Sequence, residues 1–325
     1  MAAGLLALTL AGCGGNSSTS TTRATASRAA SPTTVAPTAT TKAATTPARP
    51  PEPKPPYAVG EQVLTFVDHS RSVTYPGEAP QPRKLVTIIR YPRARGRFPL
   101  VVFGHGFAVT PGIYSQLLEA WARAGYVVAA PIFPLANAGA PGGPNESDLP
   151  NQPRDVSFVV SSMLALGSER RGPLAGRIDP SAIAASGQSD GGDTALTVTY
   201  NGSFRDPRIR AAVILSGQEI PGVGGYDFPA PSPPLLATQG LADTVNLPNT
   251  TFAFWDAAPA PKYLLTLPGA PHLGPYTDEQ PQLAIVERVT IAFLDHYLKG
   301  ERHALARMET AGRVPGLAAL QAEPG

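Results

Sequence analysis

The sequence contains a single cysteine, Cys13, so no intrachain disulfide can form. It also lacks an apolar run of the roughly 18–20 residues that a membrane-spanning helix requires. An excess of basic residues is also absent outside the N-terminus. Residues 1–56 hold five basic residues and one acidic residue, so with a net charge of +2 the remaining residues 57–325 carry −2. A basic field that would attract nucleic acid is therefore absent from this part, and no nucleic-acid partner is expected.

The N-terminus has the pattern of an export signal. Residues 2–12 form a short apolar stretch that ends in small residues, which is typical of the h-region of a signal peptide. The stretch runs into Leu10-Ala11-Gly12-Cys13, which resembles the lipobox of bacterial lipoproteins. We therefore expect residues 1–13 to be a lipoprotein signal with acylation of Cys13. The protein would be exported and anchored by lipid to the outer face of the bacterial membrane, or released. The alternative is a chance apolar N-terminus with a buried cysteine.

Composition divides the rest of the chain into three parts. Residues 14–56 are rich in Ser, Thr, Ala and Pro and have almost no large apolar side chains, so they cannot offset the entropy cost of ordering. We interpret this segment as a disordered stalk. The folded domain is expected over residues 57–300, and residues 301–325 are expected to be a C-terminal tail.

Within residues 57–300, apolar strand patterns alternate with helical ones. Strands are predicted at 62–68, 85–91, 99–104, 126–130, 182–186, 209–216, 234–238 and 262–267, and helices at 112–124, 153–166, 190–200 and 281–299. The first two strands read as an antiparallel section. The alternation that follows indicates an α/β fold with a mainly parallel sheet covered by helices on both faces. No repeat or second domain is evident, and we expect a monomer.

The sequence Gly187-Gln188-Ser189-Asp190-Gly191-Gly192 follows a buried strand and opens a helix. This is the Gly-x-Ser-x-Gly nucleophile elbow in the context that its chemistry requires. The tight turn pushes the Ser189 hydroxyl above the carboxyl end of the strand. The helix that begins there directs its N–H groups and positive dipole end toward the same point. Ser189 is therefore the candidate nucleophile.

A serine hydroxyl needs a base, and on this fold the chain order is serine, then acid, then histidine. His272 lies in a loop directly after a strand, and it is the candidate base. His296, within the last predicted helix, and His303, in the tail, are interpreted as solvated residues. Asp243 follows the preceding strand and is the candidate acid that fixes the imidazole tautomer. Asp227 is the alternative acid.

The tetrahedral intermediate needs hydrogen-bond donors for its oxyanion. One is expected to be the backbone N–H of Asp190, and the other the N–H of Phe107 in the loop Gly104-His105-Gly106-Phe107-Ala108. The glycines of this loop allow the backbone to approach the substrate. His105 is an alternative catalyst, but we expect its side chain to support the loop. Of Asp190, only the backbone is required by the geometry.

These motifs resemble the α/β-hydrolase superfamily over roughly residues 60–300. The resemblance is to the compact esterases related to dienelactone hydrolases, chlorophyllases, platelet-activating-factor acetylhydrolases and secreted polyester hydrolases. It implies hydrolysis of a carboxylic ester through an acyl-enzyme, without a metal or organic cofactor, on a small-molecule, lipid or polymeric ester. Only about 18 residues separate Ser216 from the strand at Pro234, so no large cap domain is expected. Gly106, Phe107 and Tyr114 are candidate substrate-binding residues, although the two aromatic residues can equally be packing residues.

Three functions remain open at this point. The first is an extracytoplasmic serine carboxylesterase. The second is an acyltransferase or peptidase that uses the same nucleophile. The third is a surface lipoprotein that binds a ligand on an inactive hydrolase scaffold, since a fold by itself does not give a function. The complete Ser-Asp-His order favours the first.

Overall fold

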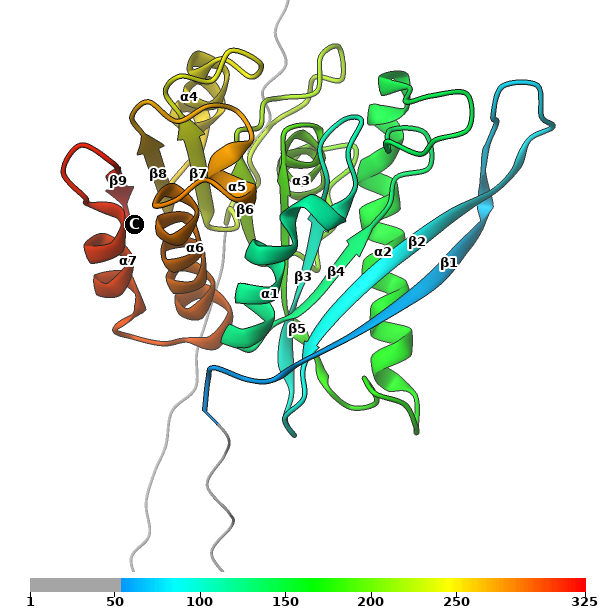
Figure 1. The fold of residues 1–325 in the computed structure, drawn as a ribbon, viewed down its shortest axis with the longest axis horizontal. Coiled ribbons are helices and arrows are strands. Elements are labelled where there is room, and N and C mark those ends of the chain that lie inside the picture. The colour runs from blue at the N-terminus through cyan, green and yellow to red at the C-terminus, as the bar shows by residue number, and fades with distance from the viewer. Residues whose placement is uncertain (1–53) are drawn as a thin grey trace, which may run out of the picture. The chain divides into compact units, whose positions relative to one another are not determined.

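The computed structural model describes residues 54–325, and its framework is one sheet of nine strands (Figure 1). The spatial order is β1-β2-β4-β3-β5-β6-β7-β8-β9. The strands are β1 Val59–Val73, β2 Gln81–Pro92, β3 Phe98–Gly104, β4 Val127–Pro131, β5 Ile178–Gln188, β6 Ala211–Leu215, β7 Leu235–Gly240, β8 Lys262–Leu267 and β9 Ala319–Glu323. The six strands from β4 to β8 in this order are parallel, whereas β1, β2 and β9 are antiparallel to their neighbours.

Helices cover both faces of the sheet. They are η1 Pro111–Tyr114, α1 Ser115–Ala124, η2 Glu146–Asn151, α2 Gln152–Ser168, α3 Asp190–Tyr200, α4 Pro248–Ala257, α5 Gly274–Thr277, α6 Gln282–Lys299 and α7 Ala304–Gly312. Apolar residues of α2, α3 and α4 pack in one core cluster, and those of α1, α6 and α7 pack in a second one. The expected α/β-hydrolase architecture is therefore confirmed.

Successive residues of the central strands alternate between the two cores. On β3, Leu100 and Val102 belong to the first cluster, whereas Val101 and Phe103 belong to the second, and all four are at most 1% exposed. This is the period of two that a strand imposes, here with both faces buried. Because both faces of these strands are buried, their sequences are continuous apolar runs and do not alternate between apolar and polar residues.

The prediction that residues 301–325 are only a C-terminal tail is wrong. These residues form α7 and β9, and β9 pairs antiparallel with β8 from Lys262↔Glu323 to Thr266↔Ala319. Met308 and Leu320 are buried in the second core cluster. The segment therefore completes the sheet and covers what would otherwise be an open edge at β8.

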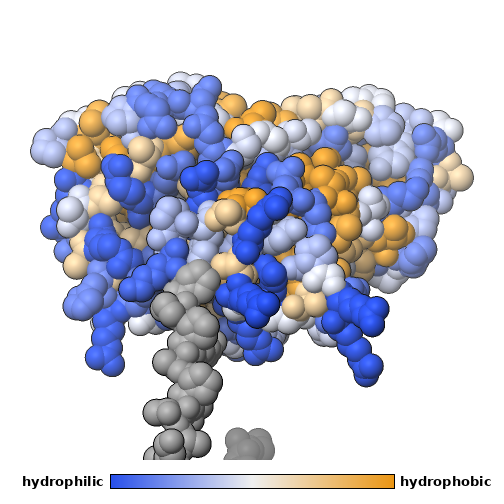
Figure 2. Space-filling model, turned by 60° about the horizontal axis from the view of Figure 1, so that its bottom comes forward, coloured by the Kyte–Doolittle hydropathy of each residue, from blue (hydrophilic) through white to orange (hydrophobic). Residues whose placement is uncertain are grey.

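The surface of the described domain mixes polar and apolar side chains. Figure 2 turns the lower side of Figure 1 toward the viewer and shows blue hydrophilic residues projecting between orange hydrophobic ones. Within residues 54–325 there is no helix of the length and apolar character needed to cross a bilayer. Outside the described residues lie the predicted signal, its lipid-attachment residue Cys13 and most of the predicted stalk.

A buried ion cluster fixes the segment that precedes α2. The Arg83 guanidinium on β2 is 2% exposed and donates to both oxygens of Asp148 at 2.9 and 2.8 Å. It also donates to both oxygens of Asp155 at 2.9 and 2.6 Å. The two carboxylates raise the pKa of Arg83 above its ordinary value, and the guanidinium therefore stays charged. Because Asp148 lies in η2 and Asp155 in α2, this cluster attaches both elements to the sheet.

Replacing Arg83 should therefore be costly. Arg83→Met leaves Asp148 without a cation in a buried position, and we expect the free energy of unfolding to fall by about 3–5 kcal/mol in urea titrations. Arg123→Met is the control, because Arg123 pairs with Glu119 on the surface and should change stability by about 1 kcal/mol or less. Equal losses in the two variants would show that the buried cluster is not a structural anchor.

Candidate active site

Ser189 lies at the junction between β5 and α3, with backbone angles of φ 56° and ψ −128°. A positive φ is sterically unfavourable for a residue with a Cβ, and it persists only where the surrounding structure enforces it. Here the Ser189 N–H donates to the Leu215 carbonyl of β6 at 3.0 Å, and the Asp193 N–H donates to the Ser189 carbonyl at 2.9 Å. The turn is thus held from both sides, and its hydroxyl is presented at the carboxyl edge of the parallel strands.

Three glycines make this turn possible by letting backbone segments touch directly. A Cβ built on Gly191 would overlap the Gly104 carbonyl group, and one built on Gly187 would overlap the Gly191 carbonyl group. The start of α3 therefore packs with its backbone against the ends of β3 and β5. This contact places the loop after β3 beside Ser189, where the Cβ position of Gly106 is 3.2 Å from the Ser189 Cβ.

The structure brings the three residues of the predicted triad into one hydrogen-bonded chain. The His272 Nε2 atom is 2.9 Å from the Ser189 hydroxyl oxygen, and its Nδ1 atom is 2.7 Å from the Asp243 Oδ2 atom. Because an ionised carboxylate only accepts, Nδ1 carries the proton and the Ser189 hydroxyl donates to Nε2. The alternative acid Asp227 makes no hydrogen bond with His272, and His296 on α6 instead lies 3.2 Å from the Glu301 carbonyl, just after the end of that helix. That the three residues catalyse a reaction stays a prediction.

Asp243 is held by several donors at once. Its Oδ1 atom accepts the backbone N–H groups of Val245 at 2.9 Å and Asn246 at 3.0 Å, and its Oδ2 atom also accepts from the Gln239 amide at 3.2 Å. These bonds, together with that from His272, outweigh burial and lower the pKa of Asp243. The carboxylate therefore stays ionised and holds the imidazole in the Nδ1–H tautomer.

His105 supports the loop after β3, as expected from the sequence. It is fully buried, its Nε2 atom accepts the Phe133 N–H at 3.0 Å, and its Nδ1 atom lies 2.7 Å from the Gly106 carbonyl oxygen. Burial lowers the pKa of His105 to about 4, so the ring is neutral at physiological pH with its proton on Nδ1. Because a trans peptide directs its C=O and N–H to opposite sides, fixing the Gly106 carbonyl inward turns the Phe107 N–H away from the buried side.

The Phe107 and Asp190 N–H groups are both available to a ligand. Neither donates to an acceptor within residues 54–325. Phe107 itself is 36% exposed and so can contact a substrate. The residue after it, Ala108, has a φ of 56°, and its N–H is bonded to the Ala136 carbonyl at 2.8 Å, which fixes the end of the loop.

Tyr114 is a buried packing residue and not a substrate-binding one, which is the second of the two roles that the sequence left open. Its side chain is fully buried, and its hydroxyl accepts the Gly106 N–H at 3.2 Å and donates to the Gln188 Oε1 atom at 2.7 Å. The Gln188 amide nitrogen in turn donates to the His272 carbonyl at 3.0 Å and lies 3.3 Å from His272 Nε2. Tyr114 and Gln188 thus connect the loop after β3 with the loop that carries His272. The sequence showed these residues but not that the fold would join them.

The Asp190 side chain is a further group that sequence reasoning did not place. It is 6% exposed, and its Oδ2 atom has no hydrogen-bond partner in the described structure. Burial, assisted by the negative charge of Glu146, raises the pKa of Asp190 to about 7, although His272 acts in the opposite direction. A carboxyl group next to the candidate nucleophile therefore changes its charge near neutral pH.

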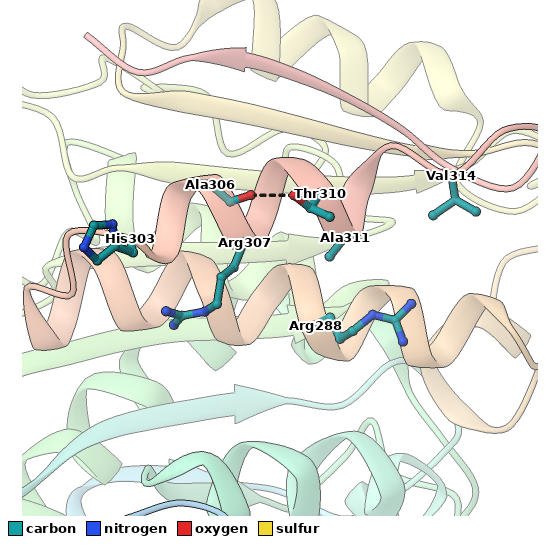
Figure 3. A pocket seen from close by; sticks show the side chains of 7 residues that line it. All are labelled: Arg288, His303, Ala306, Arg307, Thr310, Ala311 and Val314. Carbon is teal, nitrogen blue, oxygen red and sulfur yellow. Dashed lines mark hydrogen bonds between the residues drawn. The ribbon is translucent and has the colours of Figure 1, made fainter.

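Other parts of the described chain offer no competing reaction centre. No group of three or more His, Cys, Asp or Glu residues within residues 54–325 could hold a metal ion. A hollow of about 530 Å³ lies between α6 and α7 (Figure 3), and its lining residues are Arg288, His303, Ala306, Arg307, Thr310, Ala311 and Val314. None of them belongs to the Ser189 chain. Arg307 is moreover already paired with Asp295 and Glu301.

The backbone contact beneath Ser189 can be tested by adding one methyl group. Gly191→Ala should lower the free energy of unfolding by about 3 kcal/mol or more, because the new Cβ overlaps backbone atoms that cannot move aside independently. Gly112→Ala is the matched control, since its Cβ would lie 3.5 Å from the Thr110 hydroxyl, and it should change stability by less than about 0.5 kcal/mol. Thermal and urea unfolding of both variants measure this, and a tolerated Gly191→Ala would contradict the proposed packing.

Comparison with known proteins agrees with this geometry. Residues 62–223 match the family model described as Chlorophyllase. The matched region contains Phe107, Ser189 and Asp190, whereas Asp243 and His272 lie beyond it and are placed by the structure alone. No curated protein gives a significant match to the chain. With its nine-stranded, mainly parallel sheet and this family match, the chain is of the α/β-hydrolase type, and residues 62–223 resemble the chlorophyllases.

Proposed function

We propose that the protein is a serine carboxylester hydrolase that works through an acyl-enzyme. The single observation that carries the proposal is the continuous chain from the Ser189 hydroxyl through His272 to Asp243, with contacts of 2.9 and 2.7 Å. A serine hydroxyl bonded to the free nitrogen of an oriented imidazole is the arrangement that activates it as a nucleophile. The match of residues 62–223 to the Chlorophyllase model supports ester hydrolysis as the reaction.

In the first half of the reaction, the Ser189 oxygen attacks the ester carbonyl carbon while its proton passes to His272 Nε2. The carbonyl oxygen becomes an oxyanion, which the Phe107 and Asp190 N–H groups stabilise. The bond from carbon to the alcohol oxygen then breaks, and His272 gives its proton to the leaving alcohol. Asp243 stabilises the imidazolium in between, without taking the proton itself.

In the second half, water replaces the alcohol. His272 takes a proton from the water as its oxygen attacks the acyl carbon, and a second oxyanion forms in the same place. The bond to the Ser189 oxygen breaks, the carboxylic acid leaves, and the proton returns from His272 to Ser189. No redox or metal chemistry enters this cycle, because each step moves only a proton and an electron pair.

The surface around the site favours an ester with an apolar part. Six large apolar side chains of the described chain are markedly exposed, and five of them lie in two segments beside the site. Phe107 and Ile113 belong to the oxyanion loop and η1, and the other three flank the acid, namely Leu241, Val245 and Leu247. Exposed apolar groups in the segments that carry Phe107 and Asp243 support contact with an apolar part of the ester.

The N-terminal sequence supports a proposal for where the enzyme acts. We propose that the enzyme is exported as a lipoprotein, acts on small-molecule, lipid or polymeric esters outside the cytoplasm, and functions as a monomer. Retention of membrane association by the full chain, and its loss in Cys13→Ala, would support the lipid anchor.

Ester hydrolysis by purified residues 54–325 is the first test. The release of p-nitrophenol from p-nitrophenyl butyrate should fall by a factor on the order of 10³ or more in Ser189→Ala, since the nucleophile is lost. A fluorophosphonate should label the wild type at Ser189 but not the variant. Ser181→Ala, which changes an exposed serine at the start of β5, should react like the wild type.

An intact domain that neither turns over esters nor reacts with the fluorophosphonate would overturn the proposal in favour of a binding protein. Acyl transfer is distinguished by adding an acceptor alcohol. A new ester that exceeds the released acid would identify an acyltransferase instead.

The link between the two loops gives a second test. Tyr114→Phe removes the hydroxyl that joins Gly106 to Gln188, and we expect kcat to fall about tenfold with little change in KM, because the oxyanion donor and the histidine lose their common support. Tyr297→Phe is the control, since it also removes a hydrogen-bonded hydroxyl, 2.8 Å from that of Tyr263 on β8. Both variants should lose about 1 kcal/mol of stability, but only the first should lose activity. Equal kcat values would argue against the positioning role.

A further inference from the structure

Gln239, near the end of β7, is a fully buried polar residue next to the candidate acid. Its side-chain Nε2 atom lies close to three oxygen atoms. These are the Gly240 carbonyl at 2.9 Å, the Asn246 carbonyl at 3.1 Å and the Asp243 Oδ2 atom at 3.2 Å. One amide group therefore connects both ends of the loop that carries Asp243 with the carboxylate itself.

The surroundings of this amide determine which way it points. An amide oxygen only accepts hydrogen bonds, whereas an amide nitrogen donates two. The Oε1 atom of Gln239 accepts from the Thr251 hydroxyl of α4 at 2.7 Å, and the three contacts of Nε2 are all with oxygens that carry no hydrogen. Turning the amide over would place Oε1 against these three acceptors and leave them without a donor. The fold thus requires that Gln239 donates to Asp243.

This donation is made to the oxygen that also faces the candidate base. Oδ2 of Asp243 accepts from His272 Nδ1 at 2.7 Å, whereas Oδ1 is held by two backbone N–H groups of its own loop. Each carboxylate oxygen therefore has its own pair of donors, and the group cannot rotate without breaking bonds on both sides. Gln239 makes no hydrogen bond with Ser189 or His272 within residues 54–325, so its influence on them passes through Asp243.

We propose that Gln239 is a positioning residue for the triad, whose amide keeps the Oδ2 atom of Asp243 directed at His272 and shares the negative charge of that oxygen. The inference rests on the proposed esterase function. In that reaction, His272 becomes positively charged in each half, and Asp243 stabilises the charge without taking the Nδ1 proton. A second N–H donor on Oδ2 stabilises the ionised carboxylate and so favours retention of that proton by the imidazole.

The first test removes the donor and keeps most of the side-chain volume. In Gln239→Met, kcat for p-nitrophenyl butyrate should fall about tenfold, because the imidazole loses part of its orientation. KM should stay within a factor of about two, since a fully buried side chain does not contact the ester. Gln152→Met is the matched control: it removes another fully buried amide, which accepts from Thr194 at 2.8 Å, and it should keep the wild-type kcat.

A carboxyl group at the same position separates hydrogen-bond donation from packing. In Gln239→Glu, the protonated side chain still donates to Asp243, whereas the ionised one repels it. Burial and the neighbouring carboxylate raise the pKa of the introduced group. The ratio of kcat/KM in this variant to that in the wild type should therefore be highest near pH 6 and fall about tenfold by about pH 8. The corresponding ratio for Gln239→Met should change little over this range.

The groups around Asp243 support this interpretation of the ratio. His272 and Tyr276 are the titratable residues that interact with Asp243. Burial raises the pKa of Tyr276 to about 12, so its hydroxyl stays neutral over the range of the experiment. His272 is present in the wild type and in each variant, and its own titration largely cancels in the ratio. A falling ratio thus reports the ionisation of the introduced carboxyl group.

Thr251 is expected to act through Gln239. Thr251→Val keeps the side-chain shape but removes the hydroxyl that orients the amide, and kcat should fall several-fold. The double variant Thr251→Val/Gln239→Met should have the kcat of Gln239→Met alone, because the hydroxyl then has no amide to orient. Two losses that multiply in the double variant would contradict this connection.

The outcomes separate this inference from the esterase function. A wild-type kcat in Gln239→Met, or a ratio for Gln239→Glu that does not fall with pH, would overturn the positioning role and leave the esterase intact. Should Gln239→Met not fold, Gln239→Glu still decides the question, since its pH dependence is measured within one folded protein. Absence of ester hydrolysis by the wild type would overturn the proposed function, and this inference with it.

Discussion

The site depends on one close contact, in which the backbone at the start of α3 lies directly against the carboxyl ends of β3 and β5. Gly104, Gly187 and Gly191 have no side chains to separate these segments. As a result, the helix N-terminus, Ser189 and the loop after β3 share one small volume. The strained conformation of Ser189, with φ 56°, is stable only because its neighbours are fixed on both sides. Without this contact, the imidazole would have no correctly placed hydroxyl to activate.

Around this contact, the protein treats buried charge in two opposite ways. Asp148 and Asp155 are matched by Arg83 with four short hydrogen bonds, which makes the cluster an anchor for the elements beside the site. Asp190 is buried to a similar extent but has no cation and no donor. A satisfied cluster stabilises a fold, whereas an unsatisfied group costs stability and persists where function uses it. The contrast distinguishes the structural ion cluster from the unpaired acid next to Ser189.

Much of the fold could be predicted from local pattern. The strand at residues 99–104 and the helix at 190–200 were recognised because apolar runs and the elbow motif are strong signals over short distances, and the observed bounds are Phe98–Gly104 and Asp190–Tyr200. By contrast, local pattern does not predict β9, which lies in the segment expected to be a tail. Its sequence Ala-Leu-Gln-Ala-Glu has little β propensity, and it is a strand only because the edge of β8 offers it a partner. Pairing with a strand that is distant in the sequence cannot be recognised from the sequence of the segment itself.

The candidate site shows the same division between features that the local sequence predicts and features that the tertiary structure decides. The sequence by itself determined the chemistry available to this protein: the elbow around Ser189, a histidine and an aspartate in the order that an α/β-hydrolase uses, and a glycine loop before them. Such motifs are local, because a tight turn restricts residue types at adjacent positions. Only the tertiary structure decided that Tyr114 is buried and does not line a pocket, and that the Oδ2 atom of Asp190 is left without a partner. Burial and pairing are set by residues far apart in the chain, and these meet only when the sheet and its helices are assembled.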